Sequence, residues 1–375
     1  MKKDKRERRR HKLHAAEKRR RRALVSKGRA HQRRFRKSCQ PGQEPSAQRG
    51  WQRQAARKLS RKLVSIQAPE VFGLLHEERR APLLRFISHL RRFTLVARSR
   101  VRIDFRKTKQ MQPDGTLLFA AELDRIQRAV KPNKLVYCNY PKDNVVEQVL
   151  QHLGLLETMN CKARTIISAE NVREWKMYTD TSVEGELAQP LVSQYERLFP
   201  NKSGAKMYSG LTEAMTNCKH HAYARTRIDK TGVPIDQRWW MFAEERDGKL
   251  SVAFCDLGIG INRSLLTSTQ WARDTVLELV NRFGGRKDSR FIRAAMEIGK
   301  TRTLEKNRGN GLQDLKNVIA SLPTGYLLIF SNRGLYRYFS ESGTERLADY
   351  RDSILGTLIC WQIPVPKGGD KHEGN

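Results

Sequence analysis

Apolar positions along residues 53–93 recur three and four residues apart, and charged residues fill the positions between them. The apolar set comprises Leu59, Leu63, Ile66, Val71, Leu74, Leu75, Leu83, Leu84, Ile87 and Leu90. Residues at this spacing share one face of a helix, so the pattern predicts a helical segment over residues 51–97. Its apolar face suits packing against the next domain or pairing with a second copy of the chain.

Between residues 98 and 160 the pattern changes to strand, helix, strand, helix. Residues 101–105 alternate between apolar and polar, as a half-buried strand does, and residues 134–138 form a second strand. Residues 115–130 and 144–155 have helical spacing. Strands that alternate with helices predict a small α/β unit.

Residues 161–375 carry a longer series of elements that is rich in strands. Strands are expected at residues 238–244, 250–255, 326–330, 335–339 and 355–363. Helices are expected at residues 203–224, 271–283 and 289–298, and from Gly309 to Leu322. Asp247 and Gly248 mark a hairpin between the first two strands. These elements predict an antiparallel-rich sheet with helices on one face, an α+β sandwich.

Three polar residues in the helix expected at 203–224 share one face. Glu213, Asn217 and His221 are each four residues apart, so they lie on consecutive turns. A carboxylate, an amide oxygen and an imidazole in this arrangement can hold a hydrated divalent cation and leave one group to activate water. The pattern indicates phosphate chemistry, and a solvated helix face would show the same residues.

Two glycine motifs and one late threonine add to this face. DLGIG at residues 256–260 ends an apolar strand, where Asp256 can accept from an exocyclic amine and Gly258 and Gly260 let the backbone approach a flat ring. GNGL at residues 309–312 opens a helix, and the exposed backbone N–H groups of a helix start suit a polyphosphate. Thr357 begins the last strand.

In this order and spacing, the motifs resemble those of the GHKL ATP-binding superfamily, which includes gyrase, Hsp90, histidine kinases and MutL. They are most similar to the anti-sigma-factor serine kinases, whose helix motif ELVTNAxxHGY is similar to EAMTNCKHHAY at residues 213–223. Residues 256–260 and 309–312 match the DxGxG and GxGL motifs of that family. The resemblance covers about residues 207–366 and implies a GHKL-type ATP-binding domain over residues 161–375, with ATP and Mg²⁺ as cofactors.

The resemblance also implies roles for single residues. Glu213 would be the general base that orients the attacking water or hydroxyl, and Asn217 would give its amide oxygen to Mg²⁺. Asp256 would read the adenine amine, with Thr357 supporting it. The other expected cofactor-binding residues are His221, Gly258, Gly260, Arg308, Gly309, Gly311 and Leu312. Arg302, Lys306 and Arg308 would neutralise phosphates from a lid over residues 262–307, and His221 is equally typical of a helix-end histidine.

Residues 98–160 resemble a STAS-like domain of the anti-anti-sigma type, whose strand–helix junction carries DSSG. This chain has MQPDGT at residues 111–116, so the usual acceptor serine is absent and Thr116 is the one hydroxyl within reach. Asp114 is also explained as the N-cap of a helix that follows Pro113. We therefore expect a docking or inhibitory unit that regulates the ATP site of its own chain rather than a substrate.

Charge is concentrated at the N-terminus. The 375 residues have a formal net charge of +34, and residues 1–62 contain 25 Lys and Arg against four Asp and Glu. Like-charge runs stay disordered until they meet a polyanion, so residues 1–50 are expected to be a disordered tail and linker. Residues 1–37 are either a nucleic-acid-binding arm or a solubilising tail with no fixed partner.

Six cysteines occur without a CxxC pair, which predicts reduced thiols rather than zinc or disulfides. The chain has no apolar run of about 18 residues and no signal-peptide core, so we expect a cytoplasmic protein with no membrane partner. Three function classes remain open. They are an ATPase or serine/threonine protein kinase, a nucleotide-gated switch without useful turnover, and a nucleic-acid-associated protein. Expected partners besides ATP are a STAS-type or other regulatory protein, nucleic acid and a second copy of the chain.

Overall fold

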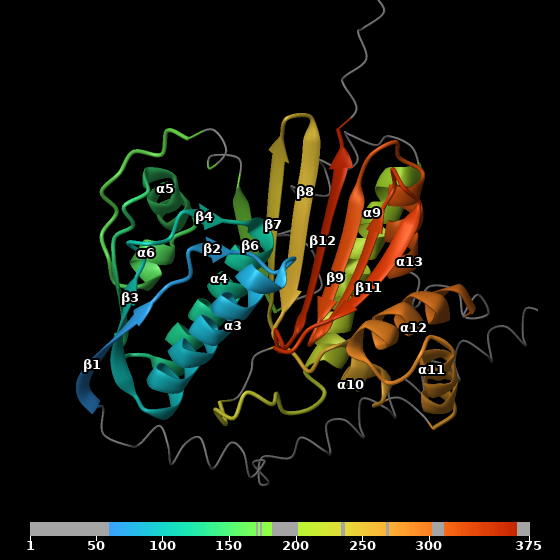
Figure 1. Cartoon of the computed structure of the whole chain (residues 1–375), viewed down its shortest axis with the longest axis horizontal. Coiled ribbons are helices and arrows are strands. Elements are labelled where there is room, and N and C mark those ends of the chain that lie inside the picture. The colour runs from blue at the N-terminus through green and yellow to red at the C-terminus, as the bar shows by residue number, and fades with distance from the viewer. Residues whose placement is uncertain are drawn as a thin grey trace, which may run out of the picture. The chain divides into compact units, whose positions relative to one another are not determined.

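The computed structural model describes residues 60–169, 172, 175–181, 202–233, 237–267, 270–301 and 311–365 (Figure 1). The expected basic tail and linker lie outside the described residues. The same holds for Arg302, Lys306, Arg308 and Gly309. The described part contains both helices and sheets, so the coarse expectation of an α+β protein is confirmed.

A parallel three-stranded sheet in the order β1-β3-β5 organises the first part of the chain. β1 (Ser60–Gln67) pairs with β3 (Ser99–Asp104), and β3 pairs with β5 (Val136–Asn139). Helix α3 (Glu77–Arg91) lies between the first two strands in sequence and α4 (Pro113–Val130) between the next two. Crossover helices of this kind are what parallel strands require, and the strand–helix alternation predicted for residues 98–160 is confirmed.

Short elements complete this unit. They are β2 (Val71–Phe72), the π-helical turn η1 (Arg92–Val96), β4 (Gln110–Met111), α5 (Asn144–His152) and α6 (Leu155–Thr158). Phe72 lies in its core, with the ring centroids of Phe86 and Phe119 at 5.9 and 5.3 Å. The strands, crossover helices and aromatic core together form an α/β unit that runs from β1 to α6, residues 60–158, and is called the first unit below.

The helical segment expected over residues 51–97 is wrong in its first half. Residues 60–67 form β1, and the helix begins only at Glu77. Leu63 and Ile66 are three residues apart, which suggested one helix face, but in the strand Leu63 is 46% exposed and Ile66 is buried. Pairing with β3 outweighs this local spacing, so β1 joins a sheet that was expected to start at residue 98.

The second part of the chain is built on a seven-stranded sheet in the order β11-β10-β9-β12-β8-β7-β6, in which all neighbours are antiparallel. The strands are β6 (Lys176–Asp180), β7 (Trp239–Arg246), β8 (Lys249–Asp256), β9 (Tyr326–Ser331), β10 (Gly334–Phe339), β11 (Thr344–Asp349) and β12 (Thr357–Pro364). Asp247 and Gly248 have φ of 52° and 66°, which confirms the hairpin between β7 and β8.

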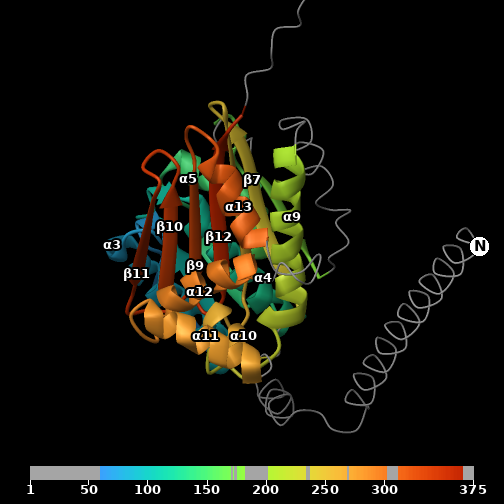
Figure 2. The same ribbon diagram turned by 90° about the vertical axis from the view of Figure 1, so that its right-hand side faces the viewer.

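The helices that the structure describes in this part follow the predicted positions closely, except the short one at residues 261–265, which was not predicted. They are α9 (Lys202–Asn217), its π-helical continuation η2 (Cys218–Ala222), α10 (Ile261–Leu265), α11 (Gln270–Arg282), α12 (Asp288–Thr301) and α13 (Gly311–Ala320). Figure 2 shows α9 and α13 side by side over one face of the sheet. The core beneath them includes Leu211, Met215, Met241, Phe254, Ile329 and Trp361.

The opposite face of this sheet is covered by the first unit. Helix α4 contacts β7, β8 and β12, and the indole of Trp240 donates to Asp124 on α4 at 2.9 Å (Figure 1). Helices were expected on one face of this sheet only. That holds for the helices of the second part of the chain, but α4 of the first unit covers the other face. Within the described ranges, no helix combines the length and apolar character needed to cross a membrane.

The junction before α4 differs from the expected N-cap. Gln112 is the N-cap residue and Pro113 the first helical residue. Asp114 is buried, and its carboxylate accepts from the backbone N–H groups of Leu74 at 3.0 Å and Gly115 at 2.7 Å. Thr116 is fully buried, so its hydroxyl is not accessible to a phosphoryl donor in the folded chain.

The five cysteines in the described ranges are free thiols, and Cys218, Cys255 and Cys360 are buried, as predicted. Cys138 and Cys161 form a pair that the sequence did not indicate, with their sulfur atoms 3.0 Å apart. Both are partly buried, and burial together with the hydrogen bond to Cys161 raises the pKa of Cys138.

We expect oxidised glutathione, at a pH alkaline enough to ionise one of the two thiols, to join Cys138 and Cys161 in the folded protein. A thiolate attacks the glutathione disulfide and releases one glutathione, and the second thiol, whose sulfur is 3.0 Å away, then displaces the other. In a Cys39→Ser background, peptide mapping by mass spectrometry should recover the 138–161 crosslink and leave the other three thiols unmodified. Cys161→Ser is the control, in which Cys138 can hold glutathione but cannot form the crosslink. Failure to crosslink while the protein remains folded contradicts the prediction.

Candidate functional site

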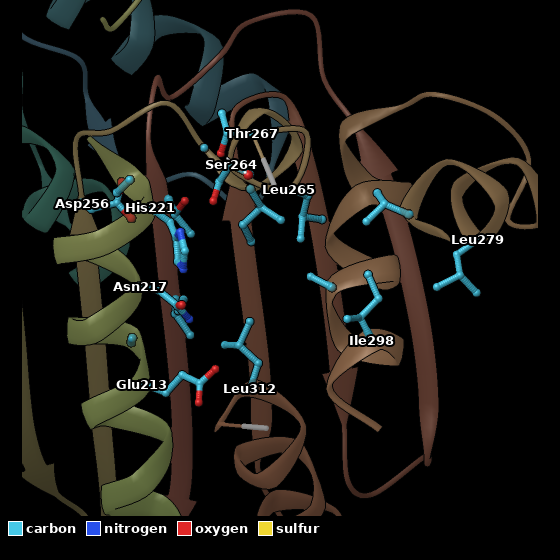
Figure 3. A pocket seen from close by; sticks show the side chains of 18 of the residues that line it. Glu213, Asn217, His221, Asp256, Ser264, Leu265, Thr267, Leu279, Ile298 and Leu312 are labelled. Atoms are coloured by element: carbon cyan, nitrogen blue, oxygen red, sulfur yellow. Dashed lines mark hydrogen bonds between the residues drawn. The ribbon is translucent and has the colours of Figure 1, made fainter. Parts of the chain in front are cut away.

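A cavity of about 590 Å³ lies along α9 and η2, at the ends of β8 and β12 and beside helices α10 to α13 (Figure 3). Seven residues that the sequence proposed for the site line it. They are Glu213, Asn217, His221, Asp256, Gly260, Leu312 and Thr357. Residues from four separate segments of the chain thus meet around one space large enough for a nucleotide-sized ligand.

The polar helix face points into this cavity. Figure 3 shows the side chains of Glu213, Asn217 and His221 directed into it from successive turns, with His221 nearest Asp256. Cys218, next to Asn217, turns into the core instead and hydrogen-bonds to the carbonyl of Arg238. The predicted face is therefore formed as helical spacing requires, and it runs from Asp256 at one end to Glu213 at the other.

Asp256 ends β8 at one end of the cavity and is 6% exposed. Its carboxylate accepts from the N–H of Gly258 at 2.8 Å and from the hydroxyl and N–H of Thr357, its cross-strand partner on β12. Burial raises the pKa of Asp256 to about 6, against these hydrogen bonds and the charge of Arg227, which lower it. At neutral pH the site therefore holds an ionised acceptor that Thr357 supports.

Packing explains both glycines of the DLGIG motif. A Cβ on Gly258 would lie 2.2 Å from the carbonyl oxygen of Ala222, which accepts from the N–H of Ile259 at 2.7 Å. Gly260 has φ of 80°, and a Cβ there would lie 2.1 Å from the side-chain nitrogen of Asn332. Gly260 lines the cavity, whereas Gly258 lies against the end of η2, which fixes the loop after Asp256 to the polar helix.

Gly311 brings the start of α13 against α9. A Cβ on Gly311 would lie 2.5 Å from the Cβ of Glu213, and a Cβ on Gly210 would lie 3.0 Å from the carbonyl oxygen of Gly311. The two glycines let the helices touch, so the N-terminus of α13 lies beside Glu213. The N–H groups of a helix start carry partial positive charge, which is suited to an anion.

Tyr223 is a structural residue of the site that the sequence analysis did not single out. It is largely buried, its hydroxyl accepts from the N–H of Leu257 at 3.1 Å, and it donates to the carbonyl of Arg238. Burial raises its pKa well above the usual value, so the hydroxyl keeps its proton. Its place as the last residue of the motif at residues 213–223 was the available signal, because a buried tyrosine hydroxyl needs polar partners.

Helices α10, α11 and α12 form the opposite wall. Two of them, α11 and α12, were predicted as helices within the segment 262–307, whereas α10 was not. The residues they and the adjoining loop contribute are Ser264, Leu265, Thr267, Thr275, Val276, Glu278, Leu279, Arg282, Ala295 and Ile298. These helices share a small core, separate from that of the sheet, of Val276, Val280, Phe291 and Ala294. The start of α10 is held by Asn332, whose amide donates to the carbonyl of Ile259 at 2.9 Å and to Asn262 at 2.8 Å.

The described residues contain no cluster of three or more His, Cys, Asp or Glu side chains that could hold a metal ion alone. Mg²⁺ commonly takes one or two protein oxygens and completes its shell with water and substrate phosphates. The oxygens of Asn217 and Glu213 face the cavity and fit that requirement. No protein-family model matches the chain, and a search of curated proteins found no similar sequence.

Proposed function

We propose that the chain is a GHKL-type ATP-binding protein that binds ATP with Mg²⁺ in this cavity and uses it as an ATPase or a protein kinase. The observation that carries the proposal is the joint position of Asp256, Asn217 and Glu213 along one cavity, in the order that base, metal and reacting phosphate require. An ionised buried acceptor suits the adenine amine at one end. A helix N-terminus beside Glu213 suits phosphates at the other.

In this proposal the chemistry at the phosphate end belongs to Glu213. Its carboxylate takes the proton of the attacking water or hydroxyl as that oxygen bonds to the γ-phosphorus, and the bond to the ADP oxygen breaks. Asn217 would hold Mg²⁺ through its amide oxygen, and the ion would supply neutralisation of the phosphate charge. The backbone N–H groups at the start of α13 would hold phosphate oxygens, and closure of α11 over the cavity would exclude water.

The direct test incubates the pure full-length protein with γ-labelled ATP and Mg²⁺. Free labelled phosphate identifies an ATPase, and label on added or own protein identifies a kinase. Binding of ATP without either product identifies a nucleotide-gated switch. Absence of ATP binding at millimolar nucleotide contradicts the proposed function.

A nucleotide-gated switch is the second candidate. The position of α11 favours it, because this helix packs mainly on α10 and α12 rather than on the sheet and can therefore move over the cavity. Regulation by the first unit is part of either function, since α4 lies directly on the back of the same sheet. Nucleic-acid binding through residues 1–37 stays a prediction.

We expect the affinity for adenosine to fall as pH decreases below about 6. The folded state takes up a proton at Asp256 more readily than the unfolded chain, so protonation favours folding while it removes the charge that attracts the adenine amine. If only the ionised form binds, the loss approaches about tenfold per pH unit. Adenosine is chosen because it has no phosphates that titrate, and calorimetry from pH 5 to 8 (about the range over which the group titrates) measures the effect.

The control for this pH dependence is Asp256→Asn, whose weaker binding should not change over the same range. An equal slope in both proteins assigns the titration to another group and contradicts the prediction.

A further inference from the structure

A buried cluster of five charged side chains joins the first unit to the chain that follows the polar helix. It comprises Arg91 of α3, Glu122 and Arg125 of α4, and Arg227 and Asp229. Each of these side chains is at most 8% exposed. None belongs to a motif that the sequence analysis identified, and Glu122 and Arg227 are 105 residues apart in sequence.

Glu122 is the centre of the cluster. One of its carboxylate oxygens accepts from Arg91 at 2.8 Å and from Arg227, and the other lies 3.5 Å from Arg125. Burial raises the pKa of Glu122, but the charges of Arg227, Arg91 and Arg125 outweigh burial and lower it to about 2. Asp229 forms an ion pair with Arg125 at 2.6 Å and lies 3.6 Å from Arg227. Both carboxylates therefore stay ionised and hold Arg227 from one side.

The other side of Arg227 faces the base end of the cavity. Its Nε donates to the carbonyl oxygen of Leu355 at 3.0 Å. Gly356 comes next, and a Cβ there would lie 2.2 Å from the carbonyl oxygen of Asp256. Thr357 then begins β12 and hydrogen-bonds to the Asp256 carboxylate. Arg227 thus fixes the backbone at Leu355, two residues before Thr357. The hydroxyl of Thr357 in turn orients the Asp256 carboxylate, which is the group proposed to bind the base.

Stability alone is a weak explanation for such a cluster. Burying several charges carries a desolvation penalty that their mutual attraction often fails to exceed, and apolar side chains of similar volume frequently serve as well. A planar guanidinium, however, can bind a carboxylate and a backbone carbonyl in fixed directions at once. Arg227 uses this property to connect Glu122 on α4 with Leu355 beside the cavity.

We propose that Arg227 is a positioning residue for base recognition, and that Glu122 of α4 holds it in place. Arg227 fixes the start of β12, so that Thr357 presents the Asp256 carboxylate to the adenine amine. The first unit thereby takes part in nucleotide selection without touching the nucleotide. This inference rests on the proposed binding of ATP in the cavity.

The test compares binding of ATP and ITP by full-length variants. ITP carries an oxo group in place of the adenine amine and has the same phosphates, so the ratio of the two dissociation constants isolates base recognition. We expect the wild type to prefer ATP and Arg227→Gln to lose roughly tenfold of that preference, the effect of about one well-placed hydrogen bond. Affinity for ITP should change much less, because the phosphate end is untouched.

Arg91→Gln is the matched control. Arg91 binds the same oxygen of Glu122, and within the described ranges no hydrogen bond joins it to Leu355. Its loss therefore breaks an equivalent buried ion pair and should leave the ATP-to-ITP ratio unchanged. If Arg227→Gln does not fold, Arg227→Lys replaces it. Lysine keeps the charge beside Glu122 but lacks the planar fork, so we expect the same direction of change in the ratio.

The outcomes separate the inference from the function on which it rests. If the wild type binds neither nucleotide, the proposed ATP binding is wrong. If it binds both equally, the proposed recognition of the adenine amine is wrong. A wild type that prefers ATP, with folded Arg227 variants that keep the full preference, overturns the positioning role alone. An equal loss of preference in Arg91→Gln also overturns it, because the cluster would then act through general packing.

Discussion

Glu213→Gln is expected to keep ATP binding and to lose about 10²–10⁴ of the turnover rate, the range typical of a removed general base. The amide has nearly the shape of the carboxylate, so the contact between α9 and Gly311 is preserved. It cannot take the proton of the attacking oxygen, so the chemical step fails while the nucleotide stays bound. Single-turnover phosphate release and equilibrium binding, measured on the same preparation, separate the two effects.

Glu278→Gln is the matched control for this change. Glu278 lines the same cavity from α11, where it pairs with Arg282 at 3.3 Å on the surface of the helix. Its loss should leave turnover within a few-fold, since an exposed ion pair contributes little, about 0–1 kcal/mol. Equal losses of turnover in the two glutamate variants would show that Glu213 is not the base.

Asn217→Ala should lose both metal-dependent binding and turnover.

Asp256→Asn is expected to weaken ATP binding by up to about a hundredfold. The amide can turn a donor towards the adenine amine or towards Thr357, and a mismatched buried polar group costs about 1–3 kcal/mol. The mismatch towards Thr357 is also present without nucleotide, so the variant should unfold at a lower temperature at pH 7, although burial of the ionised carboxylate in the wild type offsets part of this loss. Calorimetric binding and thermal unfolding, measured together, test both statements.

The control is Asp143→Asn, which makes the same atomic change at the N-cap of α5, where the carboxylate accepts from the N–H of Val146 at 3.0 Å. Asparagine and aspartate are equally good N-cap residues, so ATP binding and stability should both be retained. Wild-type ATP affinity in Asp256→Asn would rule out Asp256 as the base-reading group.

Local features of both parts could be predicted from sequence because the residues responsible are neighbours in the chain. The helix face of Glu213, Asn217 and His221 needs only a spacing of four residues, and the β7–β8 turn needs only Asp247 and Gly248. The hydrogen bond from Thr357 to Asp256 was also predicted, although through family resemblance.

The errors were strands whose local sequence pattern does not indicate a strand. β1 was predicted as helix, because its leucine and isoleucine spacing fits a helix and its partner β3 lies more than thirty residues away. β6 and β11 were not predicted at all. They are the two edges of the seven-stranded sheet and are largely half-buried or exposed, so their sequences lack a strong apolar alternation.

The alignment of Glu213, Asn217 and His221 along one wall of the cavity follows from the sequence alone, since helical geometry aligns side chains that are one turn apart. The packing of α4 on the back of the sheet and the contact between Glu122 and Arg227 depend instead on the complete fold. Charged residues are common in any sequence, and most of them are solvated at the surface, so nothing in the local sequence marks Glu122 and Arg227 as a pair. Their position between two packed units removes that water, so only the fold makes the pairing between them obligatory.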